Sequence, residues 1–94
     1  MAEVVWSNSA LSDLTSIAEY IEDDSPKYAQ ITVGKIYERT GILESHPQLG
    51  RIVPEKEVET IRELIEGNYR IIYEIVDTTV YILTIHHSSR RLSI

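Results

Sequence analysis

Two segments in the first half of the chain carry apolar residues at spacings of three and four. The stripe of the first segment consists of Leu11, Leu14, Ile17, Ala18 and Ile21. The stripe of the second consists of Ala29, Val33, Ile36, Thr40 and Leu43. This period places each set on one side of an α-helix. The polar cluster at 7–9 offers caps for the first helix, and Ser25-Pro26 is a typical start for the second. The pattern predicts two helices packed as an antiparallel hairpin, the second ending before Pro47.

In the second half of the chain the period changes to two, which is typical of β-strands. Alternating segments cover 61–65, 69–76 and 80–85, and a short β-prone segment at 4–6 precedes the helices. Turn signals at 66–68 and 77–79 separate the last three strands. Because such short turns join antiparallel neighbours, these strands should form a meander. The order β-α-α-β-β-β predicts an α+β fold, with the helical hairpin packed on one face of an antiparallel sheet.

Length and composition restrict the class of protein further. The chain has 94 residues, enough for one domain, so we expect residues 1–94 to form a single domain. It has no cysteine, which excludes disulfides and thiolate metal sites. Its apolar runs fall far short of the ~20 residues that cross a bilayer. The first residues lack the basic and apolar segments of a signal peptide. We therefore expect a cytoplasmic protein that does not enter a membrane.

The net charge of −6 is distributed unevenly along the chain. Residues 1–49 carry three basic and eight acidic groups, a balance of −5, whereas residues 50–94 carry six and seven, a balance of −1. Proteins that grip nucleic acid by its phosphates usually carry a basic surplus. Any contact with nucleic acid would therefore have to use a local basic patch in the second half.

Four segments, in the order in which they follow one another along the chain, resemble one known family. They are HPQLGR at 46–51, IREL at 61–64, GNYRIIYEI at 67–75 and ILTIHHSSRR at 82–91. Together with the leading strand and helical hairpin they are similar to the RelE/ParE toxins of type II toxin–antitoxin (plasmid stabilisation) systems, over nearly the whole chain. The resemblance implies a growth-inhibiting toxin held silent by a cognate antitoxin. RelE-like members cut messenger RNA on the ribosome, whereas ParE-like members inhibit DNA gyrase by binding it.

Cutting RNA through its own 2′-hydroxyl needs a general acid, a general base and cations at the phosphate. The resemblance gives these roles to Arg70, which matches an arginine of RelE-like nucleases, together with His87 and Arg90. Arg70 could instead pair with Glu74 or with another carboxylate of the sheet. Neighbouring strand residues point to opposite faces, so only one of His86 and His87 can accompany Arg70.

The nuclease set is incomplete in this sequence, which leaves open whether the protein is an enzyme. The position of a key basic residue of RelE-like enzymes falls near Ser88, and their terminal tyrosine has no counterpart. The acidic stretch 54–59 replaces their lysines. Glu63, Glu66 and Glu74 are possible bases, but glutamates near turns are ordinarily solvated.

The pair Arg90-Arg91 matches the tail of ParE-like toxins instead. We predict that Arg62, Arg70, Arg90 and Arg91 form one positive face that binds the target or the antitoxin. The first hypothesis is a ParE-like toxin that inhibits gyrase. The alternatives are a ribosome-dependent mRNA endonuclease and a non-toxic binding module with this fold. Besides the antitoxin, a homodimer or hetero-tetramer is compatible with the sequence. No cofactor or metal is expected, because adjacent strand histidines diverge.

Overall fold

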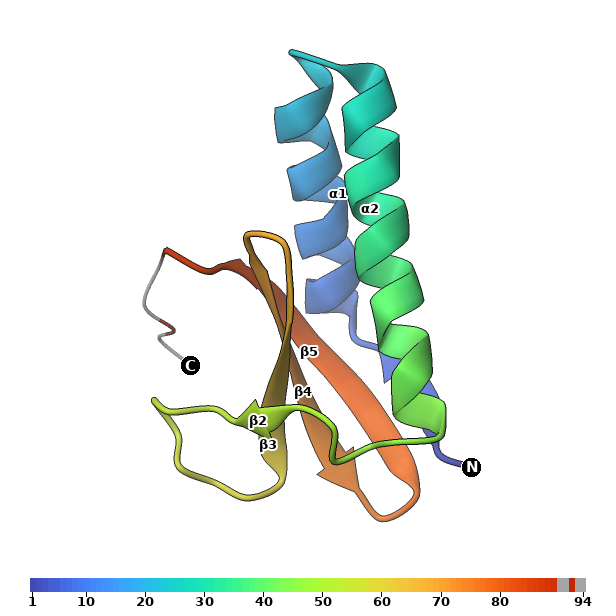
Figure 1. Cartoon of the computed structure of the whole chain (residues 1–94), viewed down its shortest axis with the longest axis vertical. Coiled ribbons are helices and arrows are strands. Elements are labelled where there is room, and N and C mark those ends of the chain that lie inside the picture. Colours follow the sequence, from blue (N-terminus) through green and yellow to red (C-terminus); the bar gives the residue numbers. More distant parts are fainter. Residues whose placement is uncertain (90–91, 93–94) are drawn as a thin grey trace.

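The computed structural model of the chain describes residues 1–89 and Leu92. In chain order the elements are β1 (Glu3–Trp6), α1 (Asn8–Glu22), α2 (Pro26–Gly41), the short 3-10 helix η1 (Ile42–Glu44), β2 (Arg51–Ile52), β3 (Ile61–Glu66), β4 (Tyr69–Val76) and β5 (Thr79–His87). The two long helices lie side by side against a five-stranded sheet, and their ends at the α1–α2 turn extend past one end of it (Figure 1). The predicted α+β architecture is confirmed. No helix in the described part of the chain is both long enough and apolar enough to cross a membrane.

Serine side chains cap both long helices at the positions that the sequence predicts. The Ser7 Oγ accepts a hydrogen bond from the backbone N–H of Ala10 at 3.0 Å. The Ser25 Oγ accepts one from the backbone N–H of Tyr28 at 3.1 Å, and Pro26 opens the first turn, where its missing N–H costs nothing. Each such cap contributes about 1 kcal/mol to helix stability.

The strand order across the sheet is β1-β5-β4-β3-β2. Strands β3, β4 and β5 form the predicted antiparallel meander. Gly67 and Asp77 are the first residues of its two short turns, with φ values of 58° and 55°. Two-residue hairpin turns require a positive φ at this position. Two features were not predicted: β1 pairs with β5 in parallel, and the two-residue strand β2 adds an antiparallel edge beside β3. An apolar pattern marks a strand without naming its partner, and two residues are too few to show a period.

The main core lies between the helices and one face of the sheet. Its buried members are Ala10, Ile36, Leu43, Leu64, Ile71, Tyr73, Val80, Ile82 and Ile85. A smaller cluster of Val53, Ile72 and Leu92 lies on the opposite side of the sheet, which we call the open face. The segment after β2 and the described residue near the C-terminus therefore cover part of the open face.

Tyr73 fixes the loop that leads into β2. Its ring is fully buried, and its hydroxyl donates to the Pro47 carbonyl at 2.7 Å while accepting from the Gly50 N–H at 2.9 Å. A Cβ atom at Gly50 would lie only 2.6 Å from that hydroxyl and 2.5 Å from the Glu63 carbonyl oxygen. Only glycine therefore lets the loop approach this closely. This contact sets the position of Arg51, the next residue.

A β-bulge in β5 changes which side chains face the helices. Ile72 pairs with Thr84 and Tyr73 pairs with Ile82, so Leu83 is an extra residue in the ladder. An extra residue reverses the alternation of the residues that follow it. Asp13 of α1 binds the bulge: its Oδ2 accepts from the Thr84 hydroxyl at 2.6 Å and from the Ile85 N–H at 3.0 Å.

Candidate functional site

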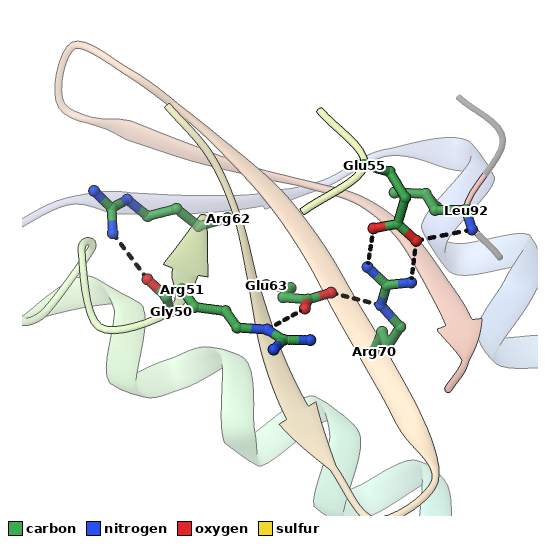
Figure 2. Close-up of polar contacts among 7 residues, drawn as sticks. All are labelled: Gly50, Arg51, Glu55, Arg62, Glu63, Arg70 and Leu92. Carbon is green, nitrogen blue, oxygen red and sulfur yellow. Dashed lines mark hydrogen bonds and ion pairs between the residues drawn. The ribbon is translucent and has the colours of Figure 1, made fainter. Parts of the chain in front are cut away.

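Arg70 lies near the start of β4 with its side chain on the open face, and only 6% of the residue is exposed. Its guanidinium binds two carboxylates of the same chain (Figure 2). The Nη1 and Nη2 groups donate to the two oxygens of Glu55 at 2.8 Å each, and Nε donates to the Oε1 of Glu63. This is the bidentate geometry in which an arginine binds a carboxylate most strongly. Arg70 therefore pairs with another carboxylate of the sheet, the second alternative left open by the sequence.

Glu63 joins three strands through its two oxygens. It lies on β3 with 1% of the residue exposed, directly opposite Arg51 of β2 in the strand register. Its Oε2 accepts from the Nε of Arg51, whose side chain is 65% exposed, while its Oε1 accepts from Arg70. Burial without partners would be costly for a carboxylate, so the two arginines allow Glu63 to be buried. The expectation that Glu63 is a solvated residue is wrong.

Glu55 reaches the cluster from the loop between β2 and β3. Its Oε2 accepts a second hydrogen bond from the backbone N–H of Leu92 at 3.2 Å. Leu92 is itself 5% exposed and packs in the cluster with Val53 and Ile72. The two arginines and two glutamates form a charge cluster, consisting of Arg51, Glu55, Glu63 and Arg70, whose formal charges cancel. A pocket of about 360 Å³ opens beside it, lined by Arg51, Pro54, Glu55, Ile65, Arg70 and Ser88.

The contacts between Arg70 and Glu55 hold both groups in their charged forms. The hydrogen bonds from Arg70, followed by the one from the backbone N–H of Glu55, lower the pKa of the Glu55 carboxyl well below its ordinary value. Burial opposes them, and the hydrogen bond from the Leu92 N–H lowers the pKa by less than burial raises it. The hydrogen bonds to Glu55 raise the pKa of Arg70, and those to Glu63 add to this effect, while burial opposes it. Both charges therefore persist at neutral pH.

Arg62 does not share a face with Arg70. It lies opposite Tyr73 in the β3–β4 register, whereas Arg70 lies opposite Ile65, so the two arginines project from opposite faces of the sheet. Its Nη1 donates to the Gly50 carbonyl at 2.9 Å, and Figure 2 shows its guanidinium directed away from the charge cluster. The predicted single positive face is therefore wrong for this pair. Its other two members, at positions 90 and 91, lie outside the described residues.

The two adjacent histidines are also placed differently from the prediction. His87 lies opposite Tyr69 on the helix side of the sheet, with ring centroids 5.5 Å apart, and its Nδ1 accepts from the Ser89 N–H at 3.2 Å. His86 lies opposite Arg70. Its Nε2 is buried and has no hydrogen-bond partner among the described residues. The grouping of His87 with Arg70 is wrong, because the bulge at Leu83 reverses the alternation.

A groove on the helix side was not predicted from the sequence. It has a volume of about 800 Å³ and lies between the far halves of α1 and α2, the β3–β4 turn and the end of β5. Apolar side chains such as Ile17, Ile21 and Ile31 line it, and Tyr20, Tyr28 and Tyr69 bring three phenols to it. Burial raises the pKa of the Tyr69 phenol, with a smaller contribution from the two other tyrosines.

Known proteins resemble this chain in both sequence and fold. Residues 4–92 match the family described as ParE toxin of type II toxin-antitoxin system, parDE. The chain is 37% identical over 91 residues to Toxin RelE2 of Caulobacter vibrioides, covering 96% of this chain and 99% of that protein. The chromosomal ParDE toxin–antitoxin system from P. aeruginosa superposes with a TM-score of 0.77 at 26% identity, over 93% of this chain and 96% of that one. The toxin–antitoxin complex RelBE2 from Mycobacterium tuberculosis gives 0.61 at 26% identity, over 92% and 96%.

The helical hairpin, the mixed sheet and these likenesses define a toxin of the RelE/ParE superfamily. The chain belongs to the ParE toxin family of type II toxin–antitoxin systems. The resemblance seen in the sequence is thereby confirmed. Proteins with RelE-type and with ParE-type names both match the chain.

Proposed function

We propose that this toxin inhibits DNA gyrase by binding it and that a cognate antitoxin neutralises it. The observation on which the choice of gyrase rests is that the guanidinium of Arg70 is already bound to carboxylates of the same chain. An arginine that binds a scissile phosphate must offer N–H groups to it. The Nε, Nη1 and Nη2 of Arg70 each donate to a carboxylate of the same chain instead. A phosphate entering here would have to displace Glu55 and would still lie next to the negative charge of Glu63.

The histidine that the resemblance assigns to a nuclease also lies away from Arg70. His87 is on the helix side of the sheet, on the opposite face from Arg70. General acid–base catalysis requires groups within hydrogen-bond reach of one reacting centre. The match of the chain to the ParE family, and the higher TM-score to ParDE than to RelBE2, also support a binding toxin.

A supercoiling assay tests the gyrase proposal. Purified toxin added to gyrase, ATP and relaxed plasmid should block supercoiling, and adding the antitoxin encoded beside the toxin gene should restore it. Growth arrest in cells, combined with unchanged supercoiling by gyrase at a molar excess of toxin, would rule the proposal out.

A ribosome-dependent mRNA endonuclease is the second candidate. It is favoured by the name of the 37% identical relative, Toxin RelE2, and by the position of His86 opposite Arg70 on the open face. Primer extension on translated messages would then reveal cleavage that His86→Gln abolishes and His87→Gln, on the other face, does not. An absence of cuts in growth-arrested cells removes this candidate.

We also propose that the antitoxin binds in the groove on the helix side. A groove with an apolar floor accepts the apolar face of an amphipathic helix from a partner. Ile31 lies in the groove and is 43% exposed, whereas Leu49 is 51% exposed and lies in the loop before β2. Ile31→Glu should weaken antitoxin binding at least about tenfold, because it introduces an unpaired charge into the interface. Leu49→Glu should leave binding within about twofold, since it lies outside the groove. Equal losses in both variants would place the antitoxin elsewhere.

A further inference from the structure

Glu55 contacts two parts of the molecule that are otherwise separate. Its two oxygens accept from Nη1 and Nη2 of Arg70, and one of them also accepts from the backbone N–H of Leu92. Figure 2 shows these contacts converging on a single carboxylate. The state of Arg70 and the position of the chain at Leu92 therefore depend on the same side chain.

The two carboxylates that bind Arg70 differ in how firmly they are held. Glu63 lies within a strand, its side chain is completely buried, and a second arginine binds its other oxygen. Glu55 lies in the loop between β2 and β3, its side chain is 19% exposed, and it lines the open pocket beside the charge cluster. The loop also contains Glu57 with a φ of 54°, a conformation that costs a non-glycine residue free energy. Glu55 is therefore the partner that can leave without disturbing the sheet.

Movement of the Glu55 side chain away from Arg70 would change the open face in two ways. It would free the Nη1 and Nη2 groups of Arg70, beside an Arg51 side chain that is already 65% exposed. It would also remove the acceptor of the Leu92 N–H, one of the contacts that hold this residue over Val53 and Ile72. A loss of Glu55 would turn a neutral, covered surface into an uncovered one with a surplus of positive charge.

We propose that Glu55 is an autoinhibitory latch, whose carboxylate occupies Arg70 and holds Leu92 over Val53 and Ile72 on the open face, the two contacts being made and broken together. In the closed state no external oxyanion binds Arg70. In the open state the Nη groups of Arg70, together with Arg51, bind one. The choice of gyrase rests on Arg70 being occupied in the closed state. In the open state an oxyanion at Arg70 would still lie next to the Glu63 carboxylate and on the opposite face of the sheet from His87.

NMR spectroscopy of the ¹⁵N-labelled full chain tests the latch, with Glu55→Gln as the perturbation and Glu57→Gln as the matched control in the same loop. Glu55→Gln should accelerate hydrogen exchange of the Leu92 amide at least about tenfold, because a charged acceptor is replaced by a weaker neutral one. Added inorganic phosphate should then shift the Arg70 Nε–Hε resonance in Glu55→Gln, but not in the unmodified chain or in Glu57→Gln. An unchanged exchange rate in Glu55→Gln, or an equal phosphate shift in the unmodified chain, overturns the proposal.

Leu92→Ala tests the coupling from the other end. This change removes an apolar anchor but leaves both carboxylates in place. Coupled contacts influence each other reciprocally. Phosphate should therefore bind Arg70 more tightly in Leu92→Ala than in the unmodified chain, though less tightly than in Glu55→Gln. Rapid exchange of the amide at position 92 with no gain in phosphate binding would show that the two contacts are independent, and the latch would be refuted.

Discussion

Replacing Arg70 by alanine removes a buried cation and leaves the carboxylate of Glu63 in place. The side chain of Glu63 has no exposed surface, so water cannot replace the lost hydrogen bond to its Oε1. Removing one partner of a buried ion pair costs about 3–5 kcal/mol, because the other charge remains desolvated. The free energy of unfolding of a domain is only about 5–15 kcal/mol. Arg70→Ala should therefore remove a large part of the stability of this protein, whatever it does to toxicity.

Arg51→Ala provides a matched control, since Arg51 binds the other oxygen of the same glutamate. Its side chain is 65% exposed, so removing it should let water reach the Oε2 of Glu63, and ion pairs that water can replace contribute only about 0–1 kcal/mol. Urea unfolding at neutral pH, followed by circular dichroism, measures both changes. The midpoint should fall strongly for Arg70→Ala and slightly for Arg51→Ala, with the slope unchanged.

Equal destabilisation by the two alanine variants, or a loss below about 1 kcal/mol for Arg70→Ala, would refute the reasoning about burial. The comparison also affects how toxicity is interpreted. A loss of toxicity in Arg70→Ala would not demonstrate a catalytic arginine unless the variant were shown to be folded at the temperature of the assay.

Three further predictions concern stability. Gly34→Ala in α2 should stabilise the protein by about 0.5–1 kcal/mol in urea unfolding, because the new Cβ meets no atom within 4 Å and alanine favours the helix. Gly50→Ala should instead lower stability by more than about 2 kcal/mol, since its Cβ would collide with backbone and with the Tyr73 hydroxyl; a stable, unshifted variant would contradict that geometry. The ionised Glu55 carboxylate stabilises the fold because its pKa is lower in the folded chain. This stabilisation is complete at a pH above the ordinary pKa near 4.5 and is lost as the pH falls toward the lowered pKa. Between pH 7 and pH 3 the urea midpoint of the unmodified chain should therefore fall more than that of Glu55→Gln, and parallel curves would exclude this role.

The sequence predicts the elements well because their periods are strong and their ends are marked. Serine caps, Pro26 and the turn at Gly67 act locally, within a few residues of where they stand. The register of the β3–β4 hairpin could also be predicted from the sequence. Counting outward from the two-residue turn places Arg70 opposite Ile65 and Arg62 opposite Tyr73, and hence on different faces.

The rest of the site depends on contacts between distant parts of the chain. No local signal shows that Glu55 returns from a loop to reach Arg70, or that Leu92 joins them. The bulge at Leu83 contains no glycine that would mark it in the sequence. It reverses the alternation along β5, so that His86 rather than His87 shares a face with Arg70. A buried charge in an apolar strand does indicate that a carboxylate must lie nearby, and this reasoning would have favoured Glu63 as a paired residue.

The parallel pairing of β1 with β5 brings the first strand of the chain against the last. The Ser7 N–H donates to the Ile82 carbonyl at 3.0 Å, and the Ser7 hydroxyl donates to the Leu83 carbonyl at 3.0 Å. Because the helical hairpin and the strands β2, β3 and β4 separate β1 from β5 along the chain, this pairing closes a long loop, and the entropy of that closure should slow folding. Until β1 docks, the outer edge of β5 remains unpaired, and an unpaired edge is a place where another strand can add to the sheet.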